Sequence, residues 1–306
     1  MPSLAEVLEN TTSPRSEVRN YVLAGFTMRL IGEPEWLEVL SEAFTHLPSS
    51  ERIPDLIVHL RCKLPELEGV NQDQIHWLNP TDPKTKQLFD PHSGMALYQF
   101  ELPILTHQQC APLLHILRMF LESRQITLLH AAVIATLKGA ALLVGRGGSG
   151  KSTTALMALK AGLQYLADDY CALGFIAEPM VYSLFSSAKF HFKDAERLHF
   201  LTMCRNPDLE KGFAMLKANY AKQLPTASPI KIILLPTLGG HLGFEPISPQ
   251  TALLALAPSS LFQLNTKQQA LKHMSHLVQV VPSYRLLLGN DPNAVPNAIQ
   301  GLLEGL

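Results

Sequence analysis

The fold of this 306-residue chain is decided by the stretch Leu142-Leu143-Val144-Gly145-Arg146-Gly147-Gly148-Ser149-Gly150-Lys151-Ser152-Thr153. It matches the pattern Gly-x-x-x-x-Gly-Lys-[Ser/Thr] at every position, with a strand-like apolar run before it and a helix-like run after it. Glycines allow successive backbone N–H groups to converge on one oxyanion, and the helix points the positive end of its dipole at the same place. The stretch therefore predicts a P-loop that binds the polyphosphate of a nucleotide.

The pattern gives its polar positions separate tasks. Lys151 is expected to bridge β- and γ-phosphate oxygens, and the hydroxyl of Ser152 is expected to ligate Mg²⁺. The alternative, a tight strand-to-helix turn with a solvent-facing lysine, is disfavoured because all fixed positions and both flanks agree. The residues expected to contact the nucleotide are Gly145, Arg146, Gly147, Gly148, Ser149, Gly150, Lys151, Ser152 and Thr153.

Two adjacent carboxylates follow closely. Asp168 and Asp169 come directly after the apolar run 163–167. One carboxylate could hold the metal ion through water, while the other could orient or deprotonate an attacking hydroxyl. Adjacent strand residues point to opposite faces, so both can serve one site only at a strand end or bend. We assign Asp168 as the base and Asp169, together with Ser152, to the metal; a solvated pair of turn aspartates is the alternative.

A histidine precedes the loop at short range. His130 lies in the apolar run 128–135, and the turn at 136–139 predicts a hairpin between this strand and strand 140–144. That hairpin would bring His130 to the mouth of the loop, where it could contact phosphate or tune the aspartates. A hydrogen-bonded core histidine is the alternative.

The order of these features resembles a known family. His130, a short hairpin, the P-loop, a single helix and then Asp168-Asp169 resemble the catalytic domain of the HPr serine kinase/phosphorylases, and most closely the HPr-kinase-related kinase A proteins. The specific resemblance covers residues 126–190, and a looser one extends to 257–264.

The resemblance implies a fold and a set of roles. It implies an α/β fold with α+β character, built on a P-loop kinase core with a mixed sheet as in phosphoenolpyruvate carboxykinases. The pattern of the residues before this core, and not the resemblance, adds a small N-terminal α+β unit. It implies ATP and Mg²⁺ as cofactors, bound through Lys151 and Ser152. It also places His130, Asp168 and Asp169 in the active site, with Lys151 among the catalytic residues.

Composition excludes several classes of protein. The chain is 47% apolar and 17% charged with a net charge of −1, which is typical of a globular protein without a nucleic-acid partner. No run approaches 18 uncharged apolar residues, and the N-terminus lacks the features of a secretory signal, so no membrane partner is expected. Four scattered cysteines without paired metal spacing fit reduced thiols in a cytoplasm.

The chain is expected to have three parts. These are a loosely ordered leader over 1–18, an α+β unit over 19–108 and the P-loop domain over 109–306. Apolar alternation predicts strands over 21–31 and 278–288.

Cations and histidines lie outside these motifs. Among the cations of the segment 186–197, Lys189 is the best candidate to stabilise transferred phosphoryl charge, a solvated helix face being the alternative. His273 and His276 have helical spacing but no third ligand, so no metal site is expected there.

These observations favour a kinase that transfers the γ-phosphoryl group of ATP to a hydroxyl, such as a serine of a protein or peptide. One alternative is a regulatory module that binds ATP and phosphorylates nothing. Another is a carboxykinase-like phosphotransferase that acts on a small molecule. The acceptor, the choice between ATP and GTP, and homo-oligomer formation stay open.

Overall fold

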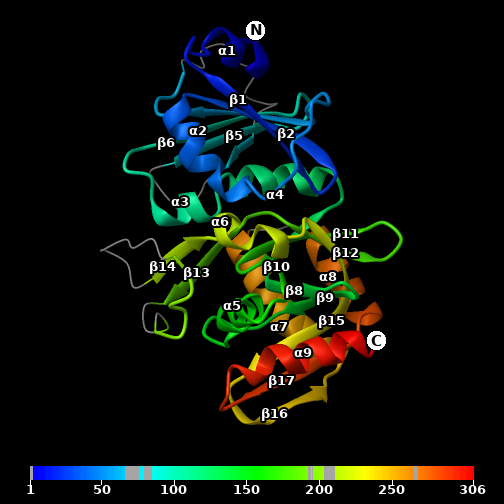
Figure 1. Cartoon of the computed structure of the whole chain (residues 1–306). Coiled ribbons are helices and arrows are strands. Elements are labelled where there is room, and N and C mark those ends of the chain that lie inside the picture. The colour runs from blue at the N-terminus through cyan, green and yellow to red at the C-terminus, as the bar shows by residue number, and fades with distance from the viewer. Residues whose placement is uncertain are drawn as a thin grey trace. The chain divides into compact units, whose positions relative to one another are not determined.

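The chain folds into two compact units, Met1–Gln125 and Ile126–Leu306. In both units of this computed structural model, helices pack on sheets that contain parallel and antiparallel strand pairs, which confirms the mixed α/β class (Figure 1). Across the described residues, no helix is long and apolar enough to cross a membrane. The structure describes residues 3–65, 76–78, 85–191, 194, 196–202, 211–264 and 268–306.

The first unit is built on a six-stranded sheet in the order β1-β2-β3-β6-β5-β4, in which β3 pairs in parallel with both of its neighbours. The single strand predicted over 21–31 is wrong, because Ala24 and Gly25 take positive φ angles of 49° and 87° and turn the chain into a β1–β2 hairpin. The elements are α1 (Leu4–Asn10), β1 (Glu17–Leu23), β2 (Phe26–Gly32), α2 (Pro34–Ser41), η1 (Glu42–Phe44), β3 (Leu56–Arg61), β4 (His76–Leu78), β5 (Thr85–Asp90), β6 (Met95–Phe100), α3 (Thr106–Cys110) and α4 (Leu114–Ser123).

The start of this unit differs from the leader predicted over 1–18. α1 begins with a capping box, in which the Glu6 N–H donates to Ser3 Oγ at 3.2 Å and the Ser3 N–H donates to the Glu6 carboxylate at 2.7 Å. The helix buries Leu4 and Leu8, so this segment is anchored to the unit by its apolar face.

The end of this unit lies later than the predicted boundary after residue 108. α4 belongs to the first unit because the ring of Phe120 packs edge-on against Phe26 and Phe89, with centroids 5.6 and 6.4 Å apart. The aromatic contacts move the boundary to Gln125, and α4 does not lead the second unit as the sequence suggested.

The second unit contains a nine-stranded sheet with the path β10-β8-β9-β15-β12-β11-β7, and off this path β17 pairs with β15 and β16 pairs with β17. β15 runs parallel to β9 and β17, and the other pairs are antiparallel. The elements are β7 (Thr127–His130), β8 (Ala132–Thr136), β9 (Gly139–Leu143), α5 (Lys151–Lys160), β10 (Gln164–Ala167), β11 (Tyr170–Phe175), β12 (Pro179–Ser183), β13 (Ser187–His191), β14 (Lys211–Met215), α6 (Lys217–Tyr220), η4 (Ala221–Gln223), β15 (Ala227–Thr237), β16 (Gly239–Pro246), α7 (Pro249–Leu264), α8 (Gln268–Val280), β17 (Ser283–Gly289) and α9 (Ala294–Glu304).

Helices bury both faces of the central strands in this unit. Alternate residues of β8 and β9, such as Ile134 and Leu143, pack with α5 and α9, while their neighbours Val133 and Leu142 pack with α7 and α8. A strand buried on both faces reads as a continuous apolar run, which is why 128–135 shows no polar alternation. Each fully buried leucine contributes about 2 kcal/mol.

One predicted strand of the second unit contains the end of a helix. The apolar run 278–288 is divided by Pro282, which lies between the last residue of α8, Val280, and the first of β17, Ser283.

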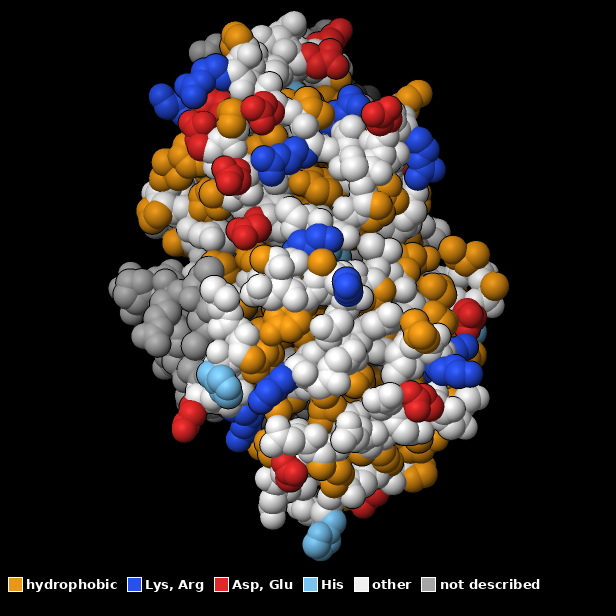
Figure 2. Space-filling view, viewed as in Figure 1, with side chains coloured by type: hydrophobic (Ala, Val, Ile, Leu, Met, Phe, Trp, Pro, Cys, Tyr) orange, Lys and Arg blue, Asp and Glu red, His pale blue; other side chains and the backbone are white. Residues whose placement is uncertain are grey.

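On the face drawn in Figure 2, acidic and basic side chains are interspersed rather than gathered by sign.

His59 on β3 is buried, with 1% of its surface exposed, beside a permanent cation. An Arg61 guanidinium nitrogen lies 3.2 Å from its Nδ1, and Thr12 Oγ1 lies 3.5 Å away. Because guanidinium only donates, Nδ1 must accept and the ring must be neutral. Burial and then the charge of Arg61 lower the pKa of His59 to about 4.

We predict that His59 makes the first unit acid-sensitive. Its stabilising contribution is complete above the unfolded pKa of about 6.5 and is lost as pH falls toward 4, by up to about 3 kcal/mol. His59→Gln should flatten the fall in unfolding free energy between pH 7 and 4.5. Urea unfolding followed by tryptophan fluorescence reads this unit alone, because both tryptophans, Trp36 and Trp77, lie in it. The exposed His92→Gln is the control, and an equally steep fall in His59→Gln would contradict the prediction.

Candidate functional site

The glycine-rich loop joins β9 to α5 and depends on backbone conformations that side chains disfavour. Gly145, Gly148 and Gly150 have φ angles of 135°, 79° and 100°. A Cβ at Gly150 would also lie 2.9 Å from a methyl group of Leu288. Glycine is therefore favoured on conformational grounds at these three positions, and at Gly150 a side chain would in addition displace the Leu288 methyl group.

Lys151 lies at the first residue of α5 and turns back under the loop. Its Nζ donates to the carbonyl oxygens of Gly145 and Arg146 at 2.8 and 3.1 Å, and only 6% of the residue is exposed. In a trans peptide the N–H points opposite to the C=O, so the amides of Arg146 and Gly147 point away from this ammonium. These two peptides thus turn their carbonyls toward the lysine and their amides outward, while the Ser149 N–H donates to the Arg146 carbonyl oxygen at 3.3 Å. The hydroxyl of Ser149 is buried without a partner among the described residues.

The carboxylate pair lies where two neighbouring strands are interrupted at the same level. Ala131 separates β7 from β8, and Asp168 and Asp169 separate β10 from β11. β10 pairs with β8 before the break and β11 with β7 after it, where Tyr170 lies opposite His130. Because the regular hydrogen-bond ladder stops here, the two aspartates need not point to opposite faces of the sheet and can both face one site. The break is therefore the strand end that the sequence required for both carboxylates to act together.

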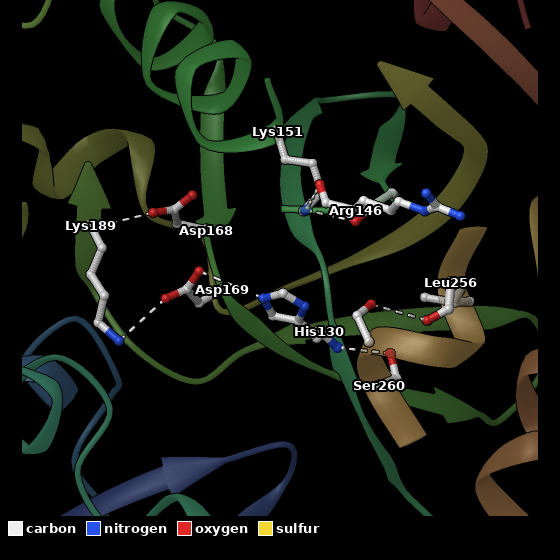
Figure 3. A network of polar contacts seen from close by, with 10 residues as sticks. His130, Arg146, Lys151, Asp168, Asp169, Lys189, Leu256 and Ser260 are labelled. Atoms are coloured by element: carbon white, nitrogen blue, oxygen red, sulfur yellow. Dashed lines mark hydrogen bonds and ion pairs between the residues drawn. The ribbon is translucent and has the colours of Figure 1, made fainter. Parts of the chain in front are cut away.

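The register brings this break to the same end of the sheet as the loop. Ala132 pairs with Leu143 in the β8–β9 hairpin predicted from the turn at 136–139. His130 precedes the start of β8 and the loop follows the end of β9, so both lie at the same end of this strand pair. Figure 3 shows them in one view with the aspartates.

Asp168 is the more buried of the two carboxylates, with 3% of its surface exposed. Its Oδ2 accepts the backbone N–H of Lys189 at 2.9 Å, while its Oδ1 is buried without a partner in the described part of the chain. Burial and then the charge of Asp169 raise the pKa of Asp168 well above its usual range, and the neighbouring Ser152 hydroxyl offsets this in part. The orphaned oxygen and the hydroxyl beside it form a set of hard oxygen donors.

Asp169 lies between two groups that can carry positive charge (Figure 3). Its Oδ2 lies 3.3 Å from Lys189 Nζ and its Oδ1 lies 3.8 Å from His130 Nε2. Burial alone would raise the pKa of Asp169, but His130 and the Lys189 ammonium hold it well below its usual range. The ring of Tyr170 supports both partners, with its centroid 5.6 Å from the imidazole and 6.0 Å from the ammonium.

The sequence missed one contributor to this cluster. Ser260 on α7 is fully buried, and its Oγ accepts the backbone N–H of His130 at 3.0 Å. This hydrogen bond fixes the last residue of β7 to α7, although Ser260 lies 130 positions after His130 in the chain. The looser resemblance over 257–264 includes Ser260 but implies no role for it, because only the tertiary fold brings it to the strand.

The other histidines do not form a metal centre. His273 Nδ1 lies 2.8 Å from Thr127 Oγ1, and both His273 and His276 pack against the ring of Phe175. Within the described ranges, no group of three or more His, Cys, Asp or Glu residues could hold a metal ion.

We predict that Asp168 destabilises the ligand-free protein at neutral pH. Because its folded pKa is raised, the folded state loses stability as pH rises above about 4. Asp168→Asn should raise Tm at pH 8, and the gain should shrink toward pH 4. Thermal unfolding of Asp168→Asn, with the exposed Asp291→Asn as control, measures this. A Tm equal to or lower than wild type at pH 8 would overturn the prediction.

Solved structures include a distant structural neighbour of this chain. No family model matches the chain, and no curated protein matches it. The solved structure of the Hpr(Ser) kinase/phosphatase from Coxiella burnetii is a structural neighbour with a TM-score of 0.34 and 9% sequence identity, covering 58% of this chain and 97% of that one. A likeness at this level carries no weight for the site, whose interpretation rests on its own geometry.

Proposed function

We propose that this protein is an ATP- and Mg²⁺-dependent kinase that transfers the γ-phosphoryl group to a hydroxyl acceptor. The observation that carries the proposal is that the residue after Lys151, Ser152, neighbours the buried Asp168, while Asp169 lies beside it between His130 and Lys189. A phosphate cradle, a set of metal ligands and a second carboxylate are the parts that phosphoryl transfer needs.

The loop supplies the phosphate cradle. The outward amides of Arg146 and Gly147 and the start of α5 favour a polyphosphate, and Lys151 would exchange the loop carbonyls for β- and γ-oxygens. The Ser149 hydroxyl, which has no partner in the part of the chain that the structure describes, is a further polar group beside this cradle.

The oxygen donors support Mg²⁺ rather than a softer metal. Asp168 and Ser152 would hold it, because both offer hard oxygen atoms and Asp168 Oδ1 is otherwise buried without a partner among the described residues. This exchanges the roles suggested by the sequence, in which Asp169 was the metal ligand. When bound, Mg²⁺ neutralises charge on the phosphate oxygens.

Asp169 is then the group that receives the acceptor hydroxyl. It orients the O–H and takes its proton as the oxygen attacks phosphorus. Its low pKa makes it a weak base, which suffices because a loose, metaphosphate-like transition state needs little proton transfer before bond formation. His130 keeps the carboxylate turned toward the acceptor.

We predict that label from γ-labelled ATP, in the presence of Mg²⁺, passes to an acceptor with the wild-type protein and with the Lys160→Ala control but not with Lys151→Ala. A desalted lysate and a metabolite pool serve as separate acceptor mixtures, and the labelled species identifies a protein or a small molecule as substrate. Lys151→Ala should lose both nucleotide binding and transfer, because it removes the ammonium at the cradle. Lys160→Ala, at the exposed end of α5, is the matched control.

Two outcomes would change the proposal. Nucleotide binding without transfer to either mixture, unaffected by Asp169→Asn, would favour the regulatory module. Transfer to a metabolite and to no macromolecule would favour the carboxykinase-like reading.

We predict that substitutions of the two aspartates have different kinetic effects, one on the Mg²⁺ requirement and the other on kcat. Asp168→Asn should raise the Mg²⁺ concentration required for half-maximal rate, since it replaces a metal ligand by a neutral amide. Asp169→Asn should leave Mg·ATP affinity nearly unchanged and lower kcat by roughly 10²–10⁴-fold. Titration calorimetry with Mg·ATP and rates over a Mg²⁺ series measure both effects. The reverse pattern would restore the assignment made from the sequence.

A further inference from the structure

We propose that Lys189 is a further catalytic residue, whose ammonium binds the phosphoryl group during transfer while its backbone amide holds Asp168 in place. This inference rests on the proposed function, because it assumes that a phosphoryl group passes over Asp169. It assigns to one residue of β13 a contact with each member of the carboxylate pair.

The strand fixes the direction of the Lys189 side chain. β13 pairs with β14, and the neighbours of Lys189 on the strand, Ala188 and Phe190, are both buried in the apolar core beside α5. Successive strand residues point to opposite faces, so Lys189 must point away from that core. Figure 3 shows it directed from β13 toward Asp169.

The backbone contact and the side-chain contact of this residue are separable. The N–H of Lys189 donates to Asp168 Oδ2 at 2.9 Å, and its Nζ lies 3.3 Å from Asp169 Oδ2. Substitution of the side chain removes the ammonium and leaves the amide that positions Asp168. The residue can therefore be tested for the ammonium alone.

The position of the Lys189–Asp169 ion pair at the edge of solvent leaves the Lys189 ammonium accessible to a phosphoryl group. Both side chains are partly exposed, Lys189 by 20% and Asp169 by 32%, so the ion pair borders solvent instead of closing a core. An acceptor hydroxyl that is hydrogen-bonded to Asp169 would attack the γ-phosphorus of the nucleotide close to this carboxylate. The Lys189 ammonium, which already contacts Asp169, would then lie within reach of the phosphoryl oxygens. Negative charge gathers on the three equatorial oxygens in transfer, and a cation already held beside them stabilises it.

The step balances without a covalent role for Lys189. The acceptor oxygen forms a bond to the γ-phosphorus, and the bond from that phosphorus to the bridging oxygen breaks, leaving its electron pair on ADP. The acceptor proton passes to the Asp169 carboxylate. Lys189 moves between the carboxylate and the phosphoryl oxygens as a counter-ion.

The test compares binding of Mg·ADP with binding of Mg·ADP plus aluminium fluoride, which mimics the phosphoryl group in transfer and needs no acceptor. In titration calorimetry, Lys189→Met should bind Mg·ADP within about 2-fold of wild type and should weaken the fluoride complex by about 100-fold. Lys189→Arg, which keeps the charge, should recover most of that loss. Lys231→Met, which removes a lysine paired with Glu178 at 2.8 Å away from the site, should match wild type in both titrations.

The outcomes separate this inference from the proposed function. Equal weakening of both complexes, or of neither, would overturn the role of Lys189, as would a wild-type protein that binds Mg·ADP and forms no fluoride complex. A selective loss in a protein that labels no acceptor would support Lys189 as a phosphoryl-binding cation and overturn the kinase. A wild type that binds no nucleotide would overturn both.

Discussion

The site depends on one interruption of hydrogen bonding, at the level where Ala131 stands on one strand and Asp168-Asp169 stand on its neighbour. A continuous ladder would send the two carboxylates to opposite faces of the sheet, with one of them in an apolar layer. The break lets Asp168 lie beside Ser152 at the start of α5 and lets Asp169 lie between His130 and Lys189. It also leaves backbone groups to be satisfied from elsewhere, and Ser260 supplies one such partner to His130 from α7.

Burying two adjacent carboxylates opposes folding, and the surrounding groups only partly offset that cost. Asp169 has a cation-forming partner at each oxygen, whereas Asp168 has a backbone amide at one oxygen and no partner in the described chain at the other. The asymmetry separates their pKa values in opposite directions, which is the usual way in which one site obtains two roles from one residue type. A pair kept for stability alone would be better replaced by apolar residues.

The parts that the sequence predicted are those whose signals are local. The loop, the hairpin before it and the aspartates span fewer than about fifty residues, and turn chemistry and apolar periodicity mark each of them. The same kind of signal was present in Ser3 and Glu6, three residues apart, and it is the capping box that orders the predicted leader. The β1–β2 turn was not readable, because Ala24 seldom takes a positive φ. Ser260 could not be found either, since its contact spans 130 positions.

The two halves of the site meet because one helix start serves both. Lys151 and Ser152 are consecutive, yet Lys151 turns back under the loop carbonyls while Ser152 neighbours Asp168 on the adjacent strand end. The start of a helix favours an anion, and the side chain of Ser152 at this start lies beside a carboxylate that attracts a cation. A bound anion and a bound cation at this place would each lower the cost of holding the other. For that reason we expect nucleotide and Mg²⁺ to bind cooperatively, with the buried charge of Asp168 as the element that couples them.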